Sequence, residues 1–261
     1  MTHSGSHVRP VVEEFPLDGG PAPTFASDPE AALRCYLERG FHVEPDVWTA
    51  EEVAELNAAA DRVSVVRDGT LAPMMNPHRE ESAFAAALRN PLLLAILERL
   101  VGGRVSGLQS QYFFCPPGTP GFSRHQDNFY VQAKAHVFAS AWSALEDVDA
   151  ENGGLVLFPG TNREPLLPVE VVSDQKLSAT QDPNANSRRA ILPAGYEPFV
   201  PRLSAGSVAF FHGHMVHSSN DNSTHDRWRR SLLLTYIREG EPFRAGFSAA
   251  RQVIPVYPDP A

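Results

Sequence analysis

The residue pattern changes at Arg104, and this change constrains the fold more than any other feature of the chain. Before Arg104 the sequence carries helix start and stop signals, such as Asp28 ahead of Ala31–Arg39 and Gly40 after it. After Arg104 it consists of short apolar runs separated by turn residues, which is typical of strands. Helices are predicted over Ala31–Arg39, Thr49–Val63, Glu80–Leu88 and Pro91–Leu100, and strands over Ser106–Cys115, His136–Leu145, Gly154–Phe158, Ser207–His212 and Ser231–Ile237.

Helices followed by many short strands predict an α+β fold that is mainly β. We expect a double-stranded β-helix, a jelly-roll or cupin-like core, backed by the N-terminal helices. The length of 261 residues suits one domain at 27–261, with a helical part at 27–103 and the core at 104–240. A flexible arm is expected at 1–26. The polar segment 174–196 is interpreted as a lid over a substrate or as a surface excursion without function.

The composition is that of an ordinary globular protein, with 43% hydrophobic and 20% charged residues. A formal net charge of −9 argues against a nucleic-acid partner, which basic patches would bind. No apolar run approaches the roughly 20 residues of a membrane span, and residues 1–5 do not resemble a signal peptide, so a cytoplasmic location is expected. The two cysteines, Cys35 and Cys115, indicate neither a disulfide framework nor a cysteine zinc site.

The segment His125-Gln126-Asp127 pairs an imidazole with a carboxylate two residues apart. In an extended segment such a pair lies on one side of the chain, because side chains alternate. A second histidine further along would complete a 2-His-1-carboxylate site for non-haem Fe(II). His212, His214 and His217 offer three choices, and a structural histidine is the alternative reading for each.

The run Arg227–Tyr236 is an apolar strand that opens with arginines. In a strand, Arg229 shares one face with Ser231, Leu233 and Thr235, whereas Arg230 lies on the other. An arginine that points into the core needs an anion, and a dicarboxylate cosubstrate would supply one through a bidentate contact. The alternative is that these arginines are surface charges at the start of a strand.

Taken together, these motifs resemble the phytanoyl-CoA dioxygenase (PhyH-type) branch of the Fe(II)- and 2-oxoglutarate-dependent oxygenases. The resemblance covers residues 30–240 approximately. The matching stretches, in the order that the family shows, are Cys115-Pro116-Pro117-Gly118, His125-Gln126-Asp127, Ala141-Trp142-Ser143-Ala144-Leu145-Glu146, Asn152–Thr161, and His217-Ser218-Ser219 leading to Arg229-Arg230.

The resemblance implies that His125, Asp127 and His217 bind iron and that Arg229 binds the distal carboxylate of 2-oxoglutarate. It also implies contacts to this cosubstrate from Gln111, Trp142 and Ser219. The chain departs from the family in two places. The arginine lies one residue further from the distal histidine than usual, so Arg230 or Arg227 are alternatives, and the family's frequent Pro-Gly-Ser/Thr-His reads Pro159-Gly160-Thr161-Asn162 here.

The implied function is an Fe(II)-, 2-oxoglutarate- and O₂-dependent oxygenase that hydroxylates, or otherwise oxidises, a C–H bond of a small metabolite. Halogenating relatives have a small residue in place of Asp127, so its carboxylate favours hydroxylation, desaturation or ring closure. A cupin-like metal or small-molecule binding protein without activity and a zinc hydrolase are the alternatives. Only Lys134 and Lys176 of the 22 basic residues are lysines, which suggests a GC-rich genome and secondary metabolism. The sequence does not distinguish a monomer from a dimer.

Overall fold

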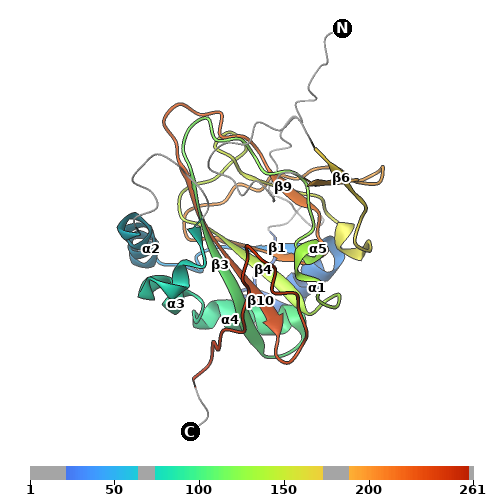
Figure 1. Cartoon of the computed structure of the whole chain (residues 1–261), viewed down its shortest axis with the longest axis horizontal. Coiled ribbons are helices and arrows are strands. Elements are labelled where there is room, and N and C mark those ends of the chain that lie inside the picture. The colour runs from blue at the N-terminus through green and yellow to red at the C-terminus, as the bar shows by residue number, and fades with distance from the viewer. Residues whose placement is uncertain (1–21, 64–73, 173–187, 259–261) are drawn as a thin grey trace.

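A six-stranded antiparallel sheet forms the centre of the protein, as the computed structural model shows for residues 22–63, 74–172 and 188–258 (Figure 1). Its strand order is β1-β8-β4-β10-β3-β2, and two short sheets, β5-β9 and β6-β7, complete the β structure of these residues. The strands are β1 Phe41–Glu44, β2 Met74–Met75, β3 Val105–Cys115, β4 Phe138–Ala144, β5 Leu155–Leu157, β6 Val169–Val171, β7 Arg188–Ala190, β8 Val208–His212, β9 His217–Ser219 and β10 Arg229–Arg238.

Helices α2, α3 and α4 lie on one side of the large sheet, and the short sheets lie on the other (Figure 1). Helix α4 contacts β3, β4 and β10, and α2 packs beside α3. The helices are α1 Pro29–Arg39, α2 Ala50–Arg62, α3 Ser82–Ala87, α4 Pro91–Val101 and α5 Asn128–Val131, with short 3-10 helices η2 Pro77–Arg79 and η3 Thr161–Arg163. No helix in the described residues is long and apolar enough to cross a membrane.

Side-chain alternation along β10 divides the interior into two regions. Leu232, Leu234 and Tyr236 face the helices and belong to the main hydrophobic core. Arg229 and Thr235 lie on the opposite face of β10 and line a cavity. Because side chains on a strand alternate between faces, one strand both stabilises the fold and equips the cavity.

The α+β, mainly β class expected from the sequence is confirmed, with helices that precede and back the antiparallel sheet. The described strands form facing sheets and not a closed barrel. The expected helix signals are present: the side chains of Asp28 and Asn90 cap α1 and α4, and Thr49 forms a capping box with Glu52 at α2. Gly102 ends α4 in the left-handed conformation.

Several elements differ from the sequence prediction. The helix predicted at Glu80–Leu88 is the shorter α3, Ser82–Ala87, and the 3-10 helix η2 ends just before the predicted start. Strand β10 begins two residues earlier than expected. The sequence did not predict β1, β2, β6, β7 or β9, because strands of two to four residues carry little periodicity of their own.

Two predicted segments fall partly outside the described residues. Of the predicted arm at 1–26, residues 1–21 lie outside the described residues. In the described part, the backbone N–H groups of Phe25 and Ala26 donate to the carboxylate of Glu44. Of the predicted lid at 174–196, residues 174–187 lie outside the described residues. The remaining part includes β7, which pairs with β6.

Candidate active site

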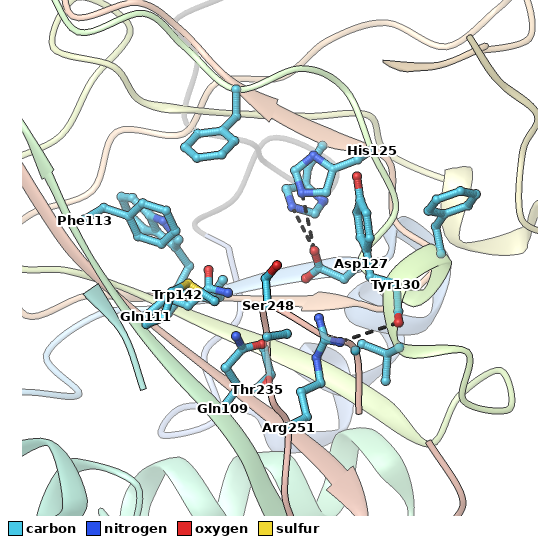
Figure 2. A pocket seen from close by; sticks show the side chains of 18 of the residues that line it. Gln109, Gln111, Phe113, His125, Asp127, Tyr130, Trp142, Thr235, Ser248 and Arg251 are labelled. Carbon is cyan, nitrogen blue, oxygen red and sulfur yellow. Dashed lines mark hydrogen bonds and ion pairs between the residues drawn. The ribbon is translucent and has the colours of Figure 1, made fainter. Parts of the chain in front are cut away.

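A cavity of about 510 Å³ lies against the face of the large sheet that is turned away from the helices (Figure 2). Strands β3, β4, β8 and β10 supply one wall, and the segments around α5, β9 and residues 244–251 supply the rest. Much of its lining is aromatic: Phe113, Phe122, Phe129, Tyr130, Phe138, Trp142, Phe211 and Phe247. Polar groups placed in such an apolar cavity are typical of a small-molecule site.

His125, Asp127 and His217 meet at one side of this cavity, with their ligand atoms within 4.8 Å of one another (Figure 2). The Asp127 Oδ1 atom lies 3.4 Å from His125 Nε2 and 3.6 Å from His217 Nε2. A pair of backbone hydrogen bonds joins the two histidines: His125 N donates to His217 O at 2.9 Å, and His217 N donates to His125 O at 3.0 Å. Strand pairing therefore brings together residues that are 92 positions apart.

Each ligand side chain is oriented by a second contact. His125 Nδ1–H donates to the carbonyl oxygen of Ser123 at 2.7 Å, and His217 Nδ1–H donates to that of Met215 at 3.1 Å. In the neutral imidazoles this leaves the Nε2 lone pairs free to bind a metal. The hydroxyl of Ser140 donates to Asp127 Oδ2 at 2.5 Å and leaves Oδ1 facing the histidines. Such contacts fix the direction in which a ligand atom points.

Burial and mutual charge set the protonation of these groups. Burial lowers the pKa of His217 to about 4, and the neighbouring His125 adds to this effect. Burial acts in the same direction on His125, but the contact with Asp127 outweighs it and raises its pKa above the ordinary value. Burial alone would raise the pKa of Asp127, yet the two imidazoles outweigh it and hold this pKa well below the usual range. The site therefore keeps an ionised carboxylate.

One detail of the predicted motif is wrong. His125 lies in an extended bridge with His217, but Asp127 has helical backbone angles of φ −57° and ψ −36° at the start of α5. The carboxylate thus reaches the histidines by a turn of the chain and not by alternation along a strand. The residues of the His-x-Asp motif do lie beside His217, although the geometry that brings them together is different from the predicted one.

The other two histidines of the predicted choice lie elsewhere. His212 ends β8, and its Nε2 lies 3.1 Å from Nδ1 of His136. His214 is in the turn that follows β8, and its Nδ1 lies 3.1 Å from the carbonyl oxygen of Glu164. Neither lines the cavity. Only His217 among the three joins His125 and Asp127.

Arg229 is the buried arginine of β10, with 3% of its surface exposed. Its Nη1 donates to Ser231 Oγ at 3.0 Å, and its Nη2 donates to Cys115 Sγ at 2.7 Å. Its Nε is buried without a hydrogen-bond partner, and no carboxylate in the described part of the chain forms an ion pair with it. A buried guanidinium without an anion is costly, so this position calls for an anionic ligand.

The alternative arginines are paired with carboxylates. Arg230 points to the other face of β10, where its Nε lies 3.3 Å from Glu146 and its Nη1 lies 3.5 Å from Asp61. Arg227 donates to Asp149 at 2.8 Å. The two faces predicted for Arg229 and Arg230 are therefore confirmed, and the geometry favours Arg229 as the anion-binding residue.

Gln111, Trp142 and Ser219 all line the same cavity. Gln111 and Trp142 are opposite Leu233 on the two sides of β10, so they occupy one row across the sheet. The Arg229 guanidinium carbon lies 5.7 Å from the centre of the Trp142 ring. The Ser219 hydroxyl accepts a hydrogen bond from Phe122 N at 2.9 Å.

The sequence prediction missed a second cluster of polar side chains that line the cavity. Gln109 and Thr235 face each other across β3 and β10, and Arg251 reaches the cavity from the chain after β10. The strand alternation that selected Arg229 also placed Thr235 on its face, which was a usable signal. Arg251 lies beyond the matched motifs, and no local pattern marks it.

Comparison with known proteins identifies a family for the chain. A family model described as phytanoyl-CoA dioxygenase (PhyH) matches residues 36–231. The peroxisomal phytanoyl-CoA dioxygenase of Mus musculus is 24% identical over 221 residues, which cover 72% of this chain and 62% of that protein. The chain thus spans about six tenths of the length of the mouse protein. The L-proline trans-4-hydroxylase of Streptomyces griseoviridis is 26% identical over 247 residues and is matched over 88% of its length, with 82% of this chain covered.

Among solved structures, the epimerase SnoN in complex with Fe³⁺, alpha-ketoglutarate and nogalamycin RO superposes with a TM-score of 0.70. The identity is 21%, and the match covers 89% of this chain and 98% of SnoN. This likeness supports the cupin-like fold. Since the PhyH family model covers well over half of the sequence, the chain belongs to the phytanoyl-CoA dioxygenase family.

Proposed function

We propose that this chain is an Fe(II)- and 2-oxoglutarate-dependent dioxygenase that oxidises a C–H bond of a small metabolite. One observation carries the proposal: a 2-His-1-carboxylate cluster and a buried arginine without a carboxylate partner line the same cavity. The first is a donor set for a transition metal, and the second is a site for an anion.

The donor set fits iron. His125, Asp127 and His217 would hold the metal through two neutral Nε2 atoms and one carboxylate oxygen, which suits Fe(II) and leaves positions open for further ligands. One carboxylate against a divalent ion leaves a positive charge, which favours a dianionic cosubstrate. Ser140, Ser123 and Met215 keep the three side chains in this arrangement.

Arg229 would bind the distal carboxylate of 2-oxoglutarate. Its guanidinium is buried, flanked by Ser231 and Cys115, and a carboxylate would satisfy the Nε that has no partner. Gln111, Trp142 and Ser219 would contact the same cosubstrate from the neighbouring walls. A charge-assisted contact to a buried guanidinium is among the stronger polar interactions in proteins.

When bound, the iron with 2-oxoglutarate and O₂ supplies an oxidant through decarboxylation of the cosubstrate to succinate. The protein's contribution is to hold the substrate next to the metal and to exclude water. The aromatic lining of the cavity serves the second purpose. Of segment 174–196, residues 174–187 lie outside the described residues, and Arg188 lines the cavity.

A zinc hydrolase would use the same three ligands but has no need for a buried guanidinium in the cavity. A cupin-like metal or small-molecule binding protein without activity could use both groups, and O₂-dependent succinate release distinguishes the proposed enzyme from it. The named relatives include a hydroxylase and an epimerase, so hydroxylation is the reaction that we propose, with epimerisation as a related outcome.

The test is anaerobic spectroscopy of the metal-free protein with Fe(II) and 2-oxoglutarate. Wild-type protein should give a weak visible charge-transfer band, and His217→Ala should lose it. His212→Ala is the matched control, because His212 lies outside the cavity, and it should keep the band. Absence of the band in the wild type would reject the proposal, and its retention in His217→Ala would reject the third ligand. The reaction itself is then scored as O₂-dependent succinate release during a substrate screen.

A further inference from the structure

The chain after β10 forms part of the cavity wall opposite the sheet. Arg244, Gly246 to Ala249 and Arg251 all line the cavity, and the segment is joined to the sheet where Gly107 and Ile254 exchange backbone hydrogen bonds. Figure 2 shows Arg251 pointing from this segment towards Asp127. The protein therefore places a second arginine in the cavity, on an element that the iron and 2-oxoglutarate ligands do not use.

The guanidinium of Arg251 is only partly engaged by the protein. Its Nη1 lies 3.4 to 3.5 Å from the carbonyl oxygens of Tyr130, Arg244 and Ala245, which are long contacts. Its Nε is buried and has no hydrogen-bond partner within the described ranges. Burial lowers the pKa of Arg251, and the charge of Asp127 offsets this in part. The guanidinium thus keeps hydrogen-bonding capacity that the described part of the protein does not use.

Two further buried polar atoms without partners lie in the same cavity. They are Nε2 of Gln109 and Oγ1 of Thr235, which are opposite each other on β3 and β10. In Figure 2, Gln109 and Thr235 lie beside Arg251. Buried polar groups are nearly always satisfied in proteins, so three unsatisfied ones along one cavity indicate a ligand with polar atoms.

The charges of the cavity specify the sign of that ligand. Its described lining contains four arginines and a single carboxylate, although the whole chain has a formal net charge of −9. 2-Oxoglutarate brings two negative charges, which roughly offset the charge of the iron site and of Arg229. Arg251 then remains as excess positive charge inside the cavity, whereas the side chains of Arg188 and Arg244 are exposed, so an anionic substrate is favoured beside Arg251.

We infer that Arg251, Gln109 and Thr235 form a carboxylate-binding subsite, and that the substrate of this enzyme is a small carboxylic acid oxidised near its carboxylate. The inference rests on the proposed function and names the substrate class for it. A carboxylate matches a guanidinium through two parallel hydrogen bonds. Gln109 donates to the same group through its amide, and Thr235 through its hydroxyl. These residues position the substrate and do not take part in the oxidation.

The test compares acids with their amides, which have nearly the same size and shape but lack the negative charge and carry an NH₂ donor in place of one oxygen. The probes are L-proline with L-prolinamide, benzoate with benzamide, and hexanoate with hexanamide. Each is titrated anaerobically by calorimetry into the protein loaded with Fe(II) and 2-oxoglutarate. At least one acid should bind more than tenfold tighter than its amide, Arg251→Gln should abolish this preference, and Arg251→Lys should restore part of it.

Arg244→Gln is the matched control, because Arg244 lines the same cavity but its side chain is exposed. This variant should keep the preference for the acid. Absence of binding by every acid, equal binding of acids and amides, or a preference that survives in Arg251→Gln would overturn the inference. Tighter binding of phenyl phosphate than of benzoate would overturn the assignment to a carboxylate. The charge-transfer band of the wild type distinguishes failure of the proposed function from failure of this inference. If the wild type lacks the band, the proposed function fails. If it has the band, only the carboxylate-binding subsite is in question.

Discussion

Replacing Arg229 with methionine tests the cosubstrate site most directly, because Arg229→Met keeps an unbranched aliphatic side chain and removes the guanidinium, with its charge and its hydrogen bonds to Ser231 and Cys115. The guanidinium is 3% exposed and has no carboxylate partner among the described residues. Loss of a charge-assisted contact to a buried anion costs about 2–5 kcal/mol. Since about 1.4 kcal/mol corresponds to a factor of ten, the dissociation constant of 2-oxoglutarate should rise by roughly 30-fold to several thousand-fold. Titration of the anaerobic charge-transfer band with 2-oxoglutarate measures this constant.

A second readout separates binding from folding. Without 2-oxoglutarate, Arg229 is a buried charge that lacks an anion, so its removal should leave the thermal unfolding midpoint unchanged or higher. With saturating 2-oxoglutarate, the wild type should gain stability and the variant should not. Arg230→Met is the matched control, because Arg230 contacts Glu146 and Asp61 on the other face of β10. If Arg230→Met weakens 2-oxoglutarate binding more than Arg229→Met does, the assignment of the anion site is wrong.

Three further predictions concern the metal site and the core. Ser140→Ala removes the hydrogen bond to Asp127 Oδ2 and should weaken Fe(II) binding about 10- to 100-fold in a metal titration; unchanged affinity would show that Ser140 does not orient the ligand. Burial lowers the pKa of His212 to about 3, so the unfolded chain binds a proton that the native state excludes. Stability to urea should therefore fall as the pH drops from about 6.5 towards 3, and less steeply in His212→Gln; equal slopes would contradict this. With the carboxylate of Asp127 in place, turnover in excess chloride should give an oxidised product without chlorine, and mass spectrometry that detects a chlorinated product would refute this.

The sequence by itself determined the class of the protein and most of its elements. Helix caps such as Asp28 and Asn90 act within one turn, so their signals are readable locally. Apolar runs of five or more residues predicted the longer strands, and alternation along β10 separated Arg229 from Arg230 before any partner was known. His125-Gln126-Asp127 identified two of the three proposed iron ligands, although Asp127 adopts a helical conformation that the motif did not indicate.

Only the tertiary structure decided which distant residues share the cavity. Three histidines between 212 and 217 are equivalent as a sequence pattern, and the pairing of His217 with His125 selects one of them. The carboxylate partners of Arg227 and Arg230 lie on other elements, and so does the strand partner of Thr235. The cavity that Arg251 lines is likewise formed by elements far from it in the sequence. These relations depend on strand register and on chain crossings over long separations. Local propensity carries no information about them, because the free energy that sets them comes from packing.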